Sequence, residues 1–361
     1  MPAANRQLIQ VVAQLQPERC GVSDFAILLA RELESKFGIG SAFAVINSTA
    51  PCDVSFPRVY RTQAELLDAC NVLSCGEPGT LLVHLSGYGF SRDGAPRELA
   101  DALSQVRKSG KFKIAVCFHE LYATGMPWRS AFWYSARQRR AVRRIAKDCD
   151  VIVTTREENA KWLERAVEPS GGGPVHLLPV FSNVGEPQEL TPMELREPVM
   201  VVLGRGNSRK RAYRRLSQIA GTVGQLGIRE IIDIGPEFEP PSQVLGIPIR
   251  RMGVLDARMV SEILSHSRFG FVPHPPSSLA KSGIFEGLCA HGTVPLLGVP
   301  FRGVIDGLQD GVHLISPRST KSALAGRLES CSSAAWRWYS GHGLRIHAAT
   351  YARLLFDRTA S

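Results

Sequence analysis

The chain has 361 residues, which is long for one domain and suits two domains of about 150 residues each. Hydrophobic residues make up 44% of the sequence and charged residues 21%, so two ordinary globular cores can form. The net charge of +10 favours an anionic partner, which is nucleic acid, anionic lipid or a phosphorylated small molecule. No stretch reaches the ~18 consecutive apolar residues of a membrane span, which excludes an integral helical membrane protein.

The amino-terminal region and the cysteines both indicate a cytoplasmic protein. Met1 leads directly into the strand-like run at 8–12, with no charged region, long apolar segment or cleavage site of a signal peptide. The eight cysteines are scattered, and no two form a C-x-x-C pair. Several, such as Cys117 and Cys289, lie inside apolar runs, so we expect buried, reduced thiols.

The first half of the chain alternates short apolar runs with amphipathic segments. The apolar runs do not alternate with polar residues, which is typical of strands buried on both faces of a parallel sheet. The predicted strands are Leu8–Ala13, Ala42–Ile46, Leu81–Leu85, Ile114–Phe118, Val151–Thr154 and Val175–Leu178. The predicted helices are Val22–Phe37, Arg97–Lys108, Arg129–Lys147 and Glu157–Ala166.

The second half repeats this alternation after a proline-rich, acidic interruption that we interpret as a linker. The predicted strands are Val199–Leu203, Ile231–Ile234, Ile249–Arg251, Phe269–Val272, Val294–Leu297 and His313–Ile315. Helices are expected to begin near Arg209, Asp256, Ser282 and Thr320, and the aromatic-rich segment Ala334–Leu355 is expected to be helical.

These elements predict an α/β chain of two Rossmann-like domains that face a central cleft. The first domain covers residues 1–185, the linker 186–198, the second domain 199–333, and a carboxyl-terminal helical segment 334–361. Ligands of open α/β sheets bind beyond the carboxyl ends of the strands, so the site is expected in that cleft.

The first chemical motif is the turn Gly204-Arg205-Gly206 between a predicted strand and a predicted helix. Glycines let backbone N–H groups approach a phosphate, the helix N-terminus adds partial positive charge, and Arg205 and Lys210 add full charges. The turn lacks the third glycine of the dinucleotide fingerprint, which argues against NAD. The alternative is a tight turn with solvated basic residues.

The second motif is Lys281-Ser282-Gly283, which opens a helix after a proline-rich loop. A lysine, a hydroxyl group and a glycine at a helix N-terminus form an anion site. Glu286 lies one turn further on and is placed to accept the paired hydroxyl groups of a ribose. In the alternative interpretation, Ser282 is only an N-cap and Glu286 faces solvent.

Two motifs in the first half follow predicted strands. Gly21 permits close approach at the start of a helix, where Asp24 either orients a hydroxyl group or favours the helix dipole. His119 ends an apolar strand, where it either bonds a sugar hydroxyl group or is a buried structural histidine. His119 and Glu120 point in opposite directions, and no third ligand lies nearby in sequence, so we expect no metal.

Three further segments are candidates for acceptor and surface contacts. The loops that carry Tyr88 and Tyr122 are where acceptor specificity would reside. The basic helix 137–147 carries Arg137, Arg140, Arg144 and Lys147 at helical spacing. This face is either solvated charge or a peripheral contact with anionic lipid on the inner side of a membrane.

The order of these motifs resembles the GT-B glycosyltransferases related to family 4, also called group 1, over most of the chain. The glycine loop at 17–26, the segment His119-Glu120-Leu121-Tyr122 with Trp128 and Trp133, and Gly204-Arg205-Gly206 with Lys210 carry the likeness. Lys281-Ser282-Gly283 through Ala290-His291-Gly292 resembles the donor-binding helix of one bacterial subgroup. Trp338-Tyr339 and His342 resemble a carboxyl-terminal helix that crosses back to the first domain.

The resemblance implies transfer of a sugar from a nucleoside diphosphate sugar to a hydroxyl acceptor. It implies that Arg205, Lys210 and Lys281 hold the diphosphate and that Glu286 holds the ribose. It also implies that the backbone around Gly253–Leu255 lies beside the edge of the base. It further implies that His119 contacts the transferred sugar and that Gly21 lies either at the donor phosphate or on the acceptor side of the cleft. The acceptor would be a saccharide, a lipid-linked saccharide or a small molecule, with no nucleic acid. Retention of configuration without metal or other cofactor is expected, because basic residues and helix dipoles stabilise the leaving diphosphate.

One position departs from the family pattern. The family has two glutamates separated by seven residues; Glu286 fits the second, but Ser278 stands at the first. The departure keeps open a degenerate scaffold that binds a nucleotide sugar or a protein without turnover. A separate alternative is a different enzyme on this architecture, either a nucleotide-sugar epimerase or an NAD-linked oxidoreductase; the incomplete fingerprint at Gly204-Arg205-Gly206 argues against the oxidoreductase.

Overall fold

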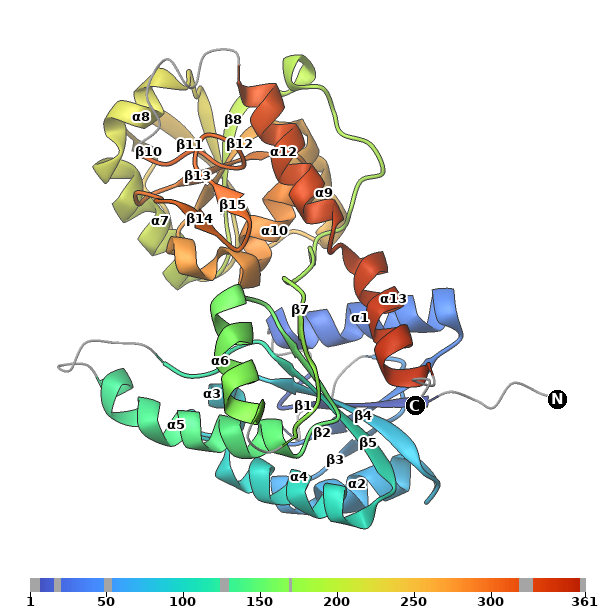
Figure 1. Cartoon of the computed structure of the whole chain (residues 1–361). Helices are drawn as coiled ribbons and strands as arrows, with labels where there is room; N and C mark the ends of the chain where they lie inside the picture. Colours follow the sequence, from blue (N-terminus) through green and yellow to red (C-terminus); the bar gives the residue numbers. More distant parts are fainter. Residues whose placement is uncertain are drawn as a thin grey trace. The chain divides into compact units, whose positions relative to one another are not determined.

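The computed structural model describes residues 7–15, 21–48, 54–123, 130–168, 171–317 and 327–357. The chain forms two compact units. Unit 1 consists of Met1–Pro179 together with Leu344–Ser361, and unit 2 is Val180–Gly343. Figure 1 shows that each unit is a sheet with helices on both faces.

Unit 1 is built on a seven-stranded parallel sheet in the order β3-β2-β1-β4-β5-β6-β7. Its strands are β1 (Gln7–Val12), β2 (Gly40–Val45), β3 (Arg58–Tyr60), β4 (Gly79–Leu85), β5 (Phe112–Phe118), β6 (Val151–Thr154) and β7 (Val175–Leu177). Its helices are α1 (Gly21–Phe37), α2 (Leu66–Leu73), α3 (Gly87–Phe90), α4 (Arg97–Ser109), α5 (Ser130–Lys147), α6 (Glu157–Val167) and α13 (Leu344–Phe356).

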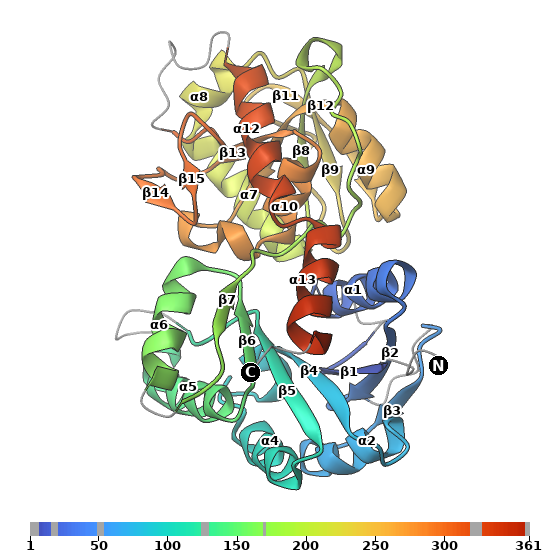
Figure 2. The same ribbon diagram turned by 45° about the vertical axis from the view of Figure 1, so that its right-hand side comes forward.

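The strands of unit 1 are almost wholly apolar because both faces of the sheet are covered. Side chains of α2, α4, α5 and α6 share one core with one face of the sheet. Side chains of α1 share a second core with the other face, where α13 lies beside α1 (Figure 2).

Unit 2 contains a six-stranded sheet in the order β10-β11-β9-β8-β12-β13, parallel except for β10. Its strands are β8 (Glu197–Leu203), β9 (Glu230–Ile234), β10 (Gln243–Val244), β11 (Ile247–Gly253), β12 (Ser267–Val272) and β13 (Val294–Leu297), with a hairpin of β14 (Val304–Ile305) and β15 (Leu308–Gln309). Its helices are α7 (Gly206–Gln218), α8 (Ala220–Gln225), α9 (Ala257–His266), α10 (Gly283–Ala290) and α12 (Leu328–Ser340), and short 3-10 turns cover Met193–Leu195 and Pro276–Lys281. One core joins the sheet to α9, α10 and α12, and another joins it to α7 and α8.

The structure confirms the predicted α/β class with parallel sheets. Two short edge elements, β3 and β10, were not predicted, because three- and two-residue strands carry no pattern of their own. The predicted strand His313–Ile315 does not form; instead, Ile315 makes an isolated bridge to Leu296 and Leu314 makes one to Asp310. The helix expected near Thr320 lies outside the described residues.

The predicted linker 186–198 lies inside unit 2 instead of between the units. Its charged residues bond within that unit: Glu186 accepts a hydrogen bond from the Tyr339 hydroxyl group, and buried Arg196 donates to the His291 carbonyl at 2.9 Å. Proline and acidic residues without periodicity therefore belong here to a packed, irregular segment. The chain passes from unit 1 to unit 2 at Pro179/Val180.

The single helix expected over Ala334–Leu355 is two helices, α12 in unit 2 and α13 in unit 1. The break falls at 341–343, where two glycines flank His342 and disfavour helix. The carboxyl-terminal helix α13 thus returns to unit 1, and the predicted boundary at 334 lies within α12.

Two further properties concern the membrane and the thiols. Among the described residues, every helix lacks either the length or the hydrophobicity needed to span a bilayer. Six cysteines fall in the described ranges, all are free, and only Cys75 among them is exposed. The prediction of reduced, mostly buried thiols is confirmed for these six.

Candidate functional site

The carboxyl edge of the sheet in unit 2 brings several predicted site residues to neighbouring turns. Because β11, β9, β8 and β12 are parallel and adjacent, their carboxyl ends lie along one edge. The turns that follow these strands carry Gly253, Gly235, Gly204 and His274 in that order. A ligand at this edge would meet residues that are far apart in sequence.

The Gly204 turn requires glycine. Gly204 has φ +125°, and a Cβ there would lie 2.9 Å from the Ile284 side chain in the first turn of α10. Gly235, at φ +144°, faces the Gly204 carbonyl oxygen so closely that a Cβ would lie 2.1 Å from it. The Gly204 turn therefore contacts both the turn after β9 and the start of α10.

A buried arginine holds these turns together. The Arg209 guanidinium donates to the Gly204 carbonyl at 3.0 Å, to the Pro236 carbonyl and to the Asp233 carboxylate. Asp233 also accepts from the Tyr213 hydroxyl group at 2.8 Å, and both members of the ion pair are fully buried. We did not predict this role for Arg209. The sequence does contain a signal for a buried cation: a lone aspartate in the apolar run of β9, because a buried charge needs a partner of opposite charge.

The second predicted turn is the N-terminus of α10. Ser282 is the N-cap, and its hydroxyl oxygen accepts from the Phe285 N–H at 3.3 Å. The same hydroxyl group bonds the His274 Nδ1 at 2.6 Å. The N-cap prediction for Ser282 is confirmed, and the hydroxyl group is already used within the protein.

Positive charge gathers around His274. Burial, followed by Arg211, Lys281 and Arg215, lowers the pKa of His274 to about 4. The imidazole is therefore neutral at pH 7 beside three cations, two from α7 and one from the 3-10 turn that precedes α10. Arg215 donates to the Pro273 carbonyl at 2.7 Å, which fixes α7 against this loop. Arg211 and Arg215 were missed by the sequence analysis, because they lie one and two turns beyond the motif.

Glu286 is fully buried, which contradicts the alternative that it faces solvent. One carboxylate oxygen, Oε2, lies 3.1 Å from the His342 Nε2, and the other, Oε1, is buried and has no hydrogen-bond partner among the described residues. Burial raises the Glu286 pKa to about 7 against the opposing effect of His342. An orphaned buried acceptor is costly, so this position favours a ligand that donates hydrogen bonds.

The remaining predicted donor residues are placed as follows. Arg205 is exposed as the N-cap residue of α7, and the exposed Lys210 lies with its Nζ 5.9 Å from the Phe238 ring centroid. Gly253 ends β11 at φ +68°, and its carbonyl oxygen accepts a hydrogen bond from the Gly235 N–H at 2.7 Å. Leu255 packs against the hydrophobic core of unit 2. Ser278 lies half-buried in the 3-10 turn before Lys281.

In unit 1, His119 belongs to a buried polar layer between the sheet and helices α1 and α13. The His84 Nε2–H donates to the Gln10 Oε1 at 2.7 Å, and the His84 Nδ1 lies 3.4 Å from the His119 Nε2. The Phe25 ring of α1 packs edge-on against both imidazoles, and against His347 of α13. His119 thus contacts neighbours from two other elements, β4 and α1.

This layer contains a group with the composition of a metal site. Ligand atoms of His84, Cys117 and His119 lie within 4.8 Å of one another, and all three residues are buried. The absence of a third ligand near His119, argued from sequence, is therefore wrong in space. Glu120 is exposed and is no part of the group. His84 is bonded to Gln10, and burial holds its pKa well below the usual value, so it is neutral.

The other predicted residues of unit 1 surround the same carboxyl edge. Gly21 begins α1 and Asp24 lies in its first turn; residues 16–20 of the glycine loop and Trp128 lie outside the described residues. Tyr88 is exposed in α3. Tyr122 is half-buried between the Arg139 guanidinium, 4.3 Å from the ring centroid, and Trp162.

Gln138 of α5 connects the two tyrosine-bearing loops. This buried amide accepts from the Ala123 N–H at 2.6 Å and donates to the Tyr88 hydroxyl at 3.2 Å and to the Asp93 carbonyl at 2.7 Å. Sequence reasoning missed Gln138 because it stands among arginines and reads as surface. One helix thus fixes both candidate acceptor loops.

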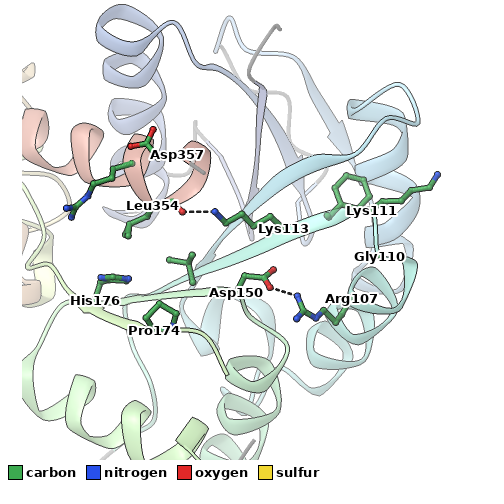
Figure 3. Close-up of a pocket in the computed structure, with 12 residues that line it drawn as sticks. Arg107, Gly110, Lys111, Lys113, Asp150, Pro174, His176, Leu354 and Asp357 are labelled. Atoms are coloured by element: carbon green, nitrogen blue, oxygen red, sulfur yellow. Dashed lines mark hydrogen bonds and ion pairs between the residues drawn. The ribbon is translucent and has the colours of Figure 1, made fainter. Parts of the chain in front are cut away.

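A cavity of 960 Å³ lies at the opposite, amino edge of the sheet in unit 1 (Figure 3). It is bounded by the starts of β5 and β6 and by the end of α13, and no predicted site residue lines it. Lys113 donates to the Leu354 carbonyl at 2.8 Å, and Arg107 pairs with Asp150. The Lys113 bond docks α13 on the sheet, and the Arg107–Asp150 pair joins α4 to the residue before β6. We assign the cavity no part in the predicted chemistry.

Solved structures share this fold over nearly the whole chain. An α-glucosyltransferase in complex with UDP has a TM-score of 0.62 at 12% identity, covering 97% of this chain and 99% of that one. The OtsA apo structure has a TM-score of 0.61 at 11% identity, covering 98% and 100%. The lipopolysaccharide outer core galactosyltransferase WaaB has a TM-score of 0.55 at 12% identity, covering 97% and 98%.

No family model and no curated protein matches the sequence. The chain has the fold of GT-B glycosyltransferases. At this low identity the similarity establishes the fold alone, and the chemistry must be argued from the residues.

Proposed function

We propose that this protein transfers a sugar from a nucleoside diphosphate sugar to a hydroxyl acceptor, with retention of configuration and without a metal. The observation that carries the proposal is the packing of the Gly204 turn against the first turn of α10 in unit 2. Each turn is the N-terminus of a helix, and helix N-termini bind phosphate through backbone N–H groups.

The charges near these turns suit a pyrophosphate. Arg205 and Lys281 stand at the two turns, Lys210 lies one helical turn further, and Arg211 and Arg215 add charge near His274. Cations placed where a diphosphate leaves stabilise the transition state without a metal ion. The solved structures of the same fold include an α-glucosyltransferase with UDP-glucose, which supports a nucleotide sugar as donor here too.

Glu286 supplies the feature that distinguishes a nucleotide from inorganic pyrophosphate. It lies one turn into α10, and its Oε1 is buried without a partner. The two hydroxyl groups of a ribose would satisfy this oxygen and replace the lost hydration. The proposal therefore orders the donor along the sheet edge, with ribose at Glu286 and pyrophosphate at the two turns. His119 and Gly21 remain proposed contacts of unit 1 with the transferred sugar and the donor phosphate.

The experiment is release of nucleoside diphosphate from UDP, GDP, ADP and dTDP sugars in the presence of candidate acceptors. Arg205→Ala and Lys281→Ala are each expected to lose about 2–4 kcal/mol of transition-state stabilisation, which is roughly 30- to 1,000-fold in kcat/KM. Arg229→Ala is the matched control, because Arg229 is an exposed arginine just before β9, at the amino edge of the same sheet. Undiminished turnover in both site variants would defeat the assignment.

A second candidate is a scaffold that binds a nucleotide sugar without transferring it. Ser278 favours it, since the family position that faces the donor sugar lacks its carboxylate. Calorimetric binding of a donor, with neither hydrolysis nor transfer across a broad acceptor panel, would support this candidate over the enzyme.

A further inference from the structure

The outer face of α5 gathers aromatic and basic side chains on one side of unit 1. Apart from Tyr134, the exposed side chains described for the helix fall within an arc of about 160° when residues are spaced by 100°. They are Phe132, Trp133, Ala136, Arg137, Arg139, Arg140, Arg143, Arg144 and Lys147. The opposite side of the helix packs into the core beside α4 and α6 (Figure 1).

This face has charge of one sign. The segment 130–147 contains six basic residues and no acidic residue. Three of the arginines are engaged by the protein: Arg144 pairs with Asp101 at 2.6 Å, Arg139 lies over Tyr122, and Arg143 lies over the Trp162 ring at 5.4 Å.

The other three cations are directed outward. Arg137, Arg140 and Lys147 are exposed, and within the described part of the chain none of them makes an ion pair or hydrogen bond. With Trp133 they occupy an arc of about 80° along roughly 20 Å of helix. Like charges held this close repel one another, so the row is suited to an extended anionic surface.

The aromatic residues indicate which kind of anionic surface this face of α5 would bind. Trp133 is 70% exposed and Phe132 44% exposed, and their rings contact each other edge-on at the start of the helix. Exposing two large rings to water is unfavourable, whereas aromatic rings beside basic residues are stabilised at the headgroup level of a bilayer.

We propose that the outer face of α5 docks unit 1 on an anionic lipid bilayer. Trp133 and Phe132 enter the headgroup region while Arg137, Arg140 and Lys147 contact lipid phosphates. Docking does not depend on the proposed enzymatic activity. It would hold the loops that Gln138 ties to this helix close to the membrane surface.

Vesicle co-sedimentation of the full chain tests the proposal. Wild type is expected to bind vesicles of phosphatidylcholine with phosphatidylglycerol and not vesicles of phosphatidylcholine alone. The triple variant Arg137→Gln, Arg140→Gln, Lys147→Gln should bind the anionic vesicles about 100-fold more weakly, at about tenfold or less per lost cation. The matched control changes Arg31, Lys36 and Arg229 to Gln, which removes the same net charge from other elements and should keep most of the binding.

A second measurement separates insertion from general charge attraction. Brominated lipid should quench tryptophan fluorescence of wild type but much less that of Trp133→Phe. Equal vesicle binding by wild type and the α5 triple variant would overturn the proposal. So would a triple change that abolishes binding to mixed-sequence duplex DNA while leaving vesicle binding intact. Unfolding curves of each variant establish that a loss is not misfolding.

Discussion

The Glu286 Oε2 and the His342 Nε2 lie 3.1 Å apart inside unit 2, and they come from α10 and from the break between α12 and α13. The Trp338 ring packs edge-on against His342, with ring centroids 4.5 Å apart, and holds the imidazole against the carboxylate. Asp306 is a further negative charge that acts on Glu286. His342 therefore orients Glu286 through Oε2, while Oε1 has no hydrogen-bond partner among the described residues.

Nucleotide affinity is expected to depend on pH through Glu286. Its pKa is about 7, so the carboxyl group is largely protonated at pH 6 and ionised at pH 8. Ribose hydroxyl groups donate to the ionised form, so affinity for UDP should rise between these values and protons should be released on binding. Calorimetry in two buffers of different ionisation enthalpy measures both quantities. Glu286→Gln should flatten the dependence; the titration of the nucleotide itself is common to both proteins.

The same shift predicts how stability varies with pH. The folded-state pKa of Glu286, about 7, lies above the ordinary value of 4.5, so the folded state holds the proton more tightly. Stability from this group is present below the ordinary pKa and is lost as pH rises through about 7, amounting to about 3 kcal/mol. Glu286→Gln lacks this loss and should gain stability relative to wild type from pH 5 to pH 8. Urea denaturation measures the free energy of unfolding of both proteins at each pH. If the difference between wild type and Glu286→Gln stayed constant over that range, the result would contradict the raised pKa.

Removal of Arg209 should destabilise unit 2 strongly. Arg209→Met leaves the buried Asp233 carboxylate without its charged partner, and such losses cost about 3–5 kcal/mol. The variant should also release the Gly204 turn, so nucleotide binding should weaken even where the protein is folded. Arg258→Met is the control, because Arg258 pairs with Glu262 on the exposed surface of α9 and should change stability by at most about 1 kcal/mol. Chemical denaturation measures both.

Gly235→Ala tests the contact between the two turns. A Cβ at this position meets the Gly204 carbonyl at a backbone conformation that L residues rarely adopt. We expect a loss of about 2–3 kcal/mol or more, from strain plus displacement of the phosphate-binding turn. Gly221→Ala, in α8 with open space around its Cβ position, should leave stability unchanged or raise it by up to about 1 kcal/mol. Equal midpoints of thermal unfolding for the two variants would refute the close contact.

Treatment with a chelator tests the expectation that no metal takes part. Turnover or nucleotide binding should survive EDTA, because the proposed charge stabilisation comes from arginine and lysine. Loss of activity with EDTA, restored by Zn²⁺ in wild type but not in His84→Gln, would instead assign a metal to His84, Cys117 and His119. Elemental analysis of the purified protein provides the independent readout.

The sequence predicted long elements better than their junctions. Buried parallel strands such as β4 and β5 are apolar runs bounded by turns, so composition alone locates them. The break at 341–343 was missed because the aromatic pattern continues on both sides of it, although Gly341 and Gly343 disfavour helix there. The packed state of residues 186–198 was also missed, because their packing depends on partners as distant in sequence as Tyr339.

The candidate site divides in a similar way. Gly204 and Ser282 could be found because turn and cap chemistry is local. Arg211, Arg215 and Gln138 could not, because their roles depend on which loops the sheet order brings beside them. Arg209 is an intermediate case. The lone aspartate of β9 predicts that a buried partner exists, but the sequence does not show which residue it is.

A crystal structure of the full chain with a bound nucleoside diphosphate tests the central claim most directly. We expect the pyrophosphate at the N–H groups that open α7 and α10, with Arg205 and Lys281 directed at it and the ribose on Glu286. A pyrophosphate bound elsewhere, with those two side chains in solvent and the Glu286 Oε1 still without a hydrogen-bond partner, would contradict it.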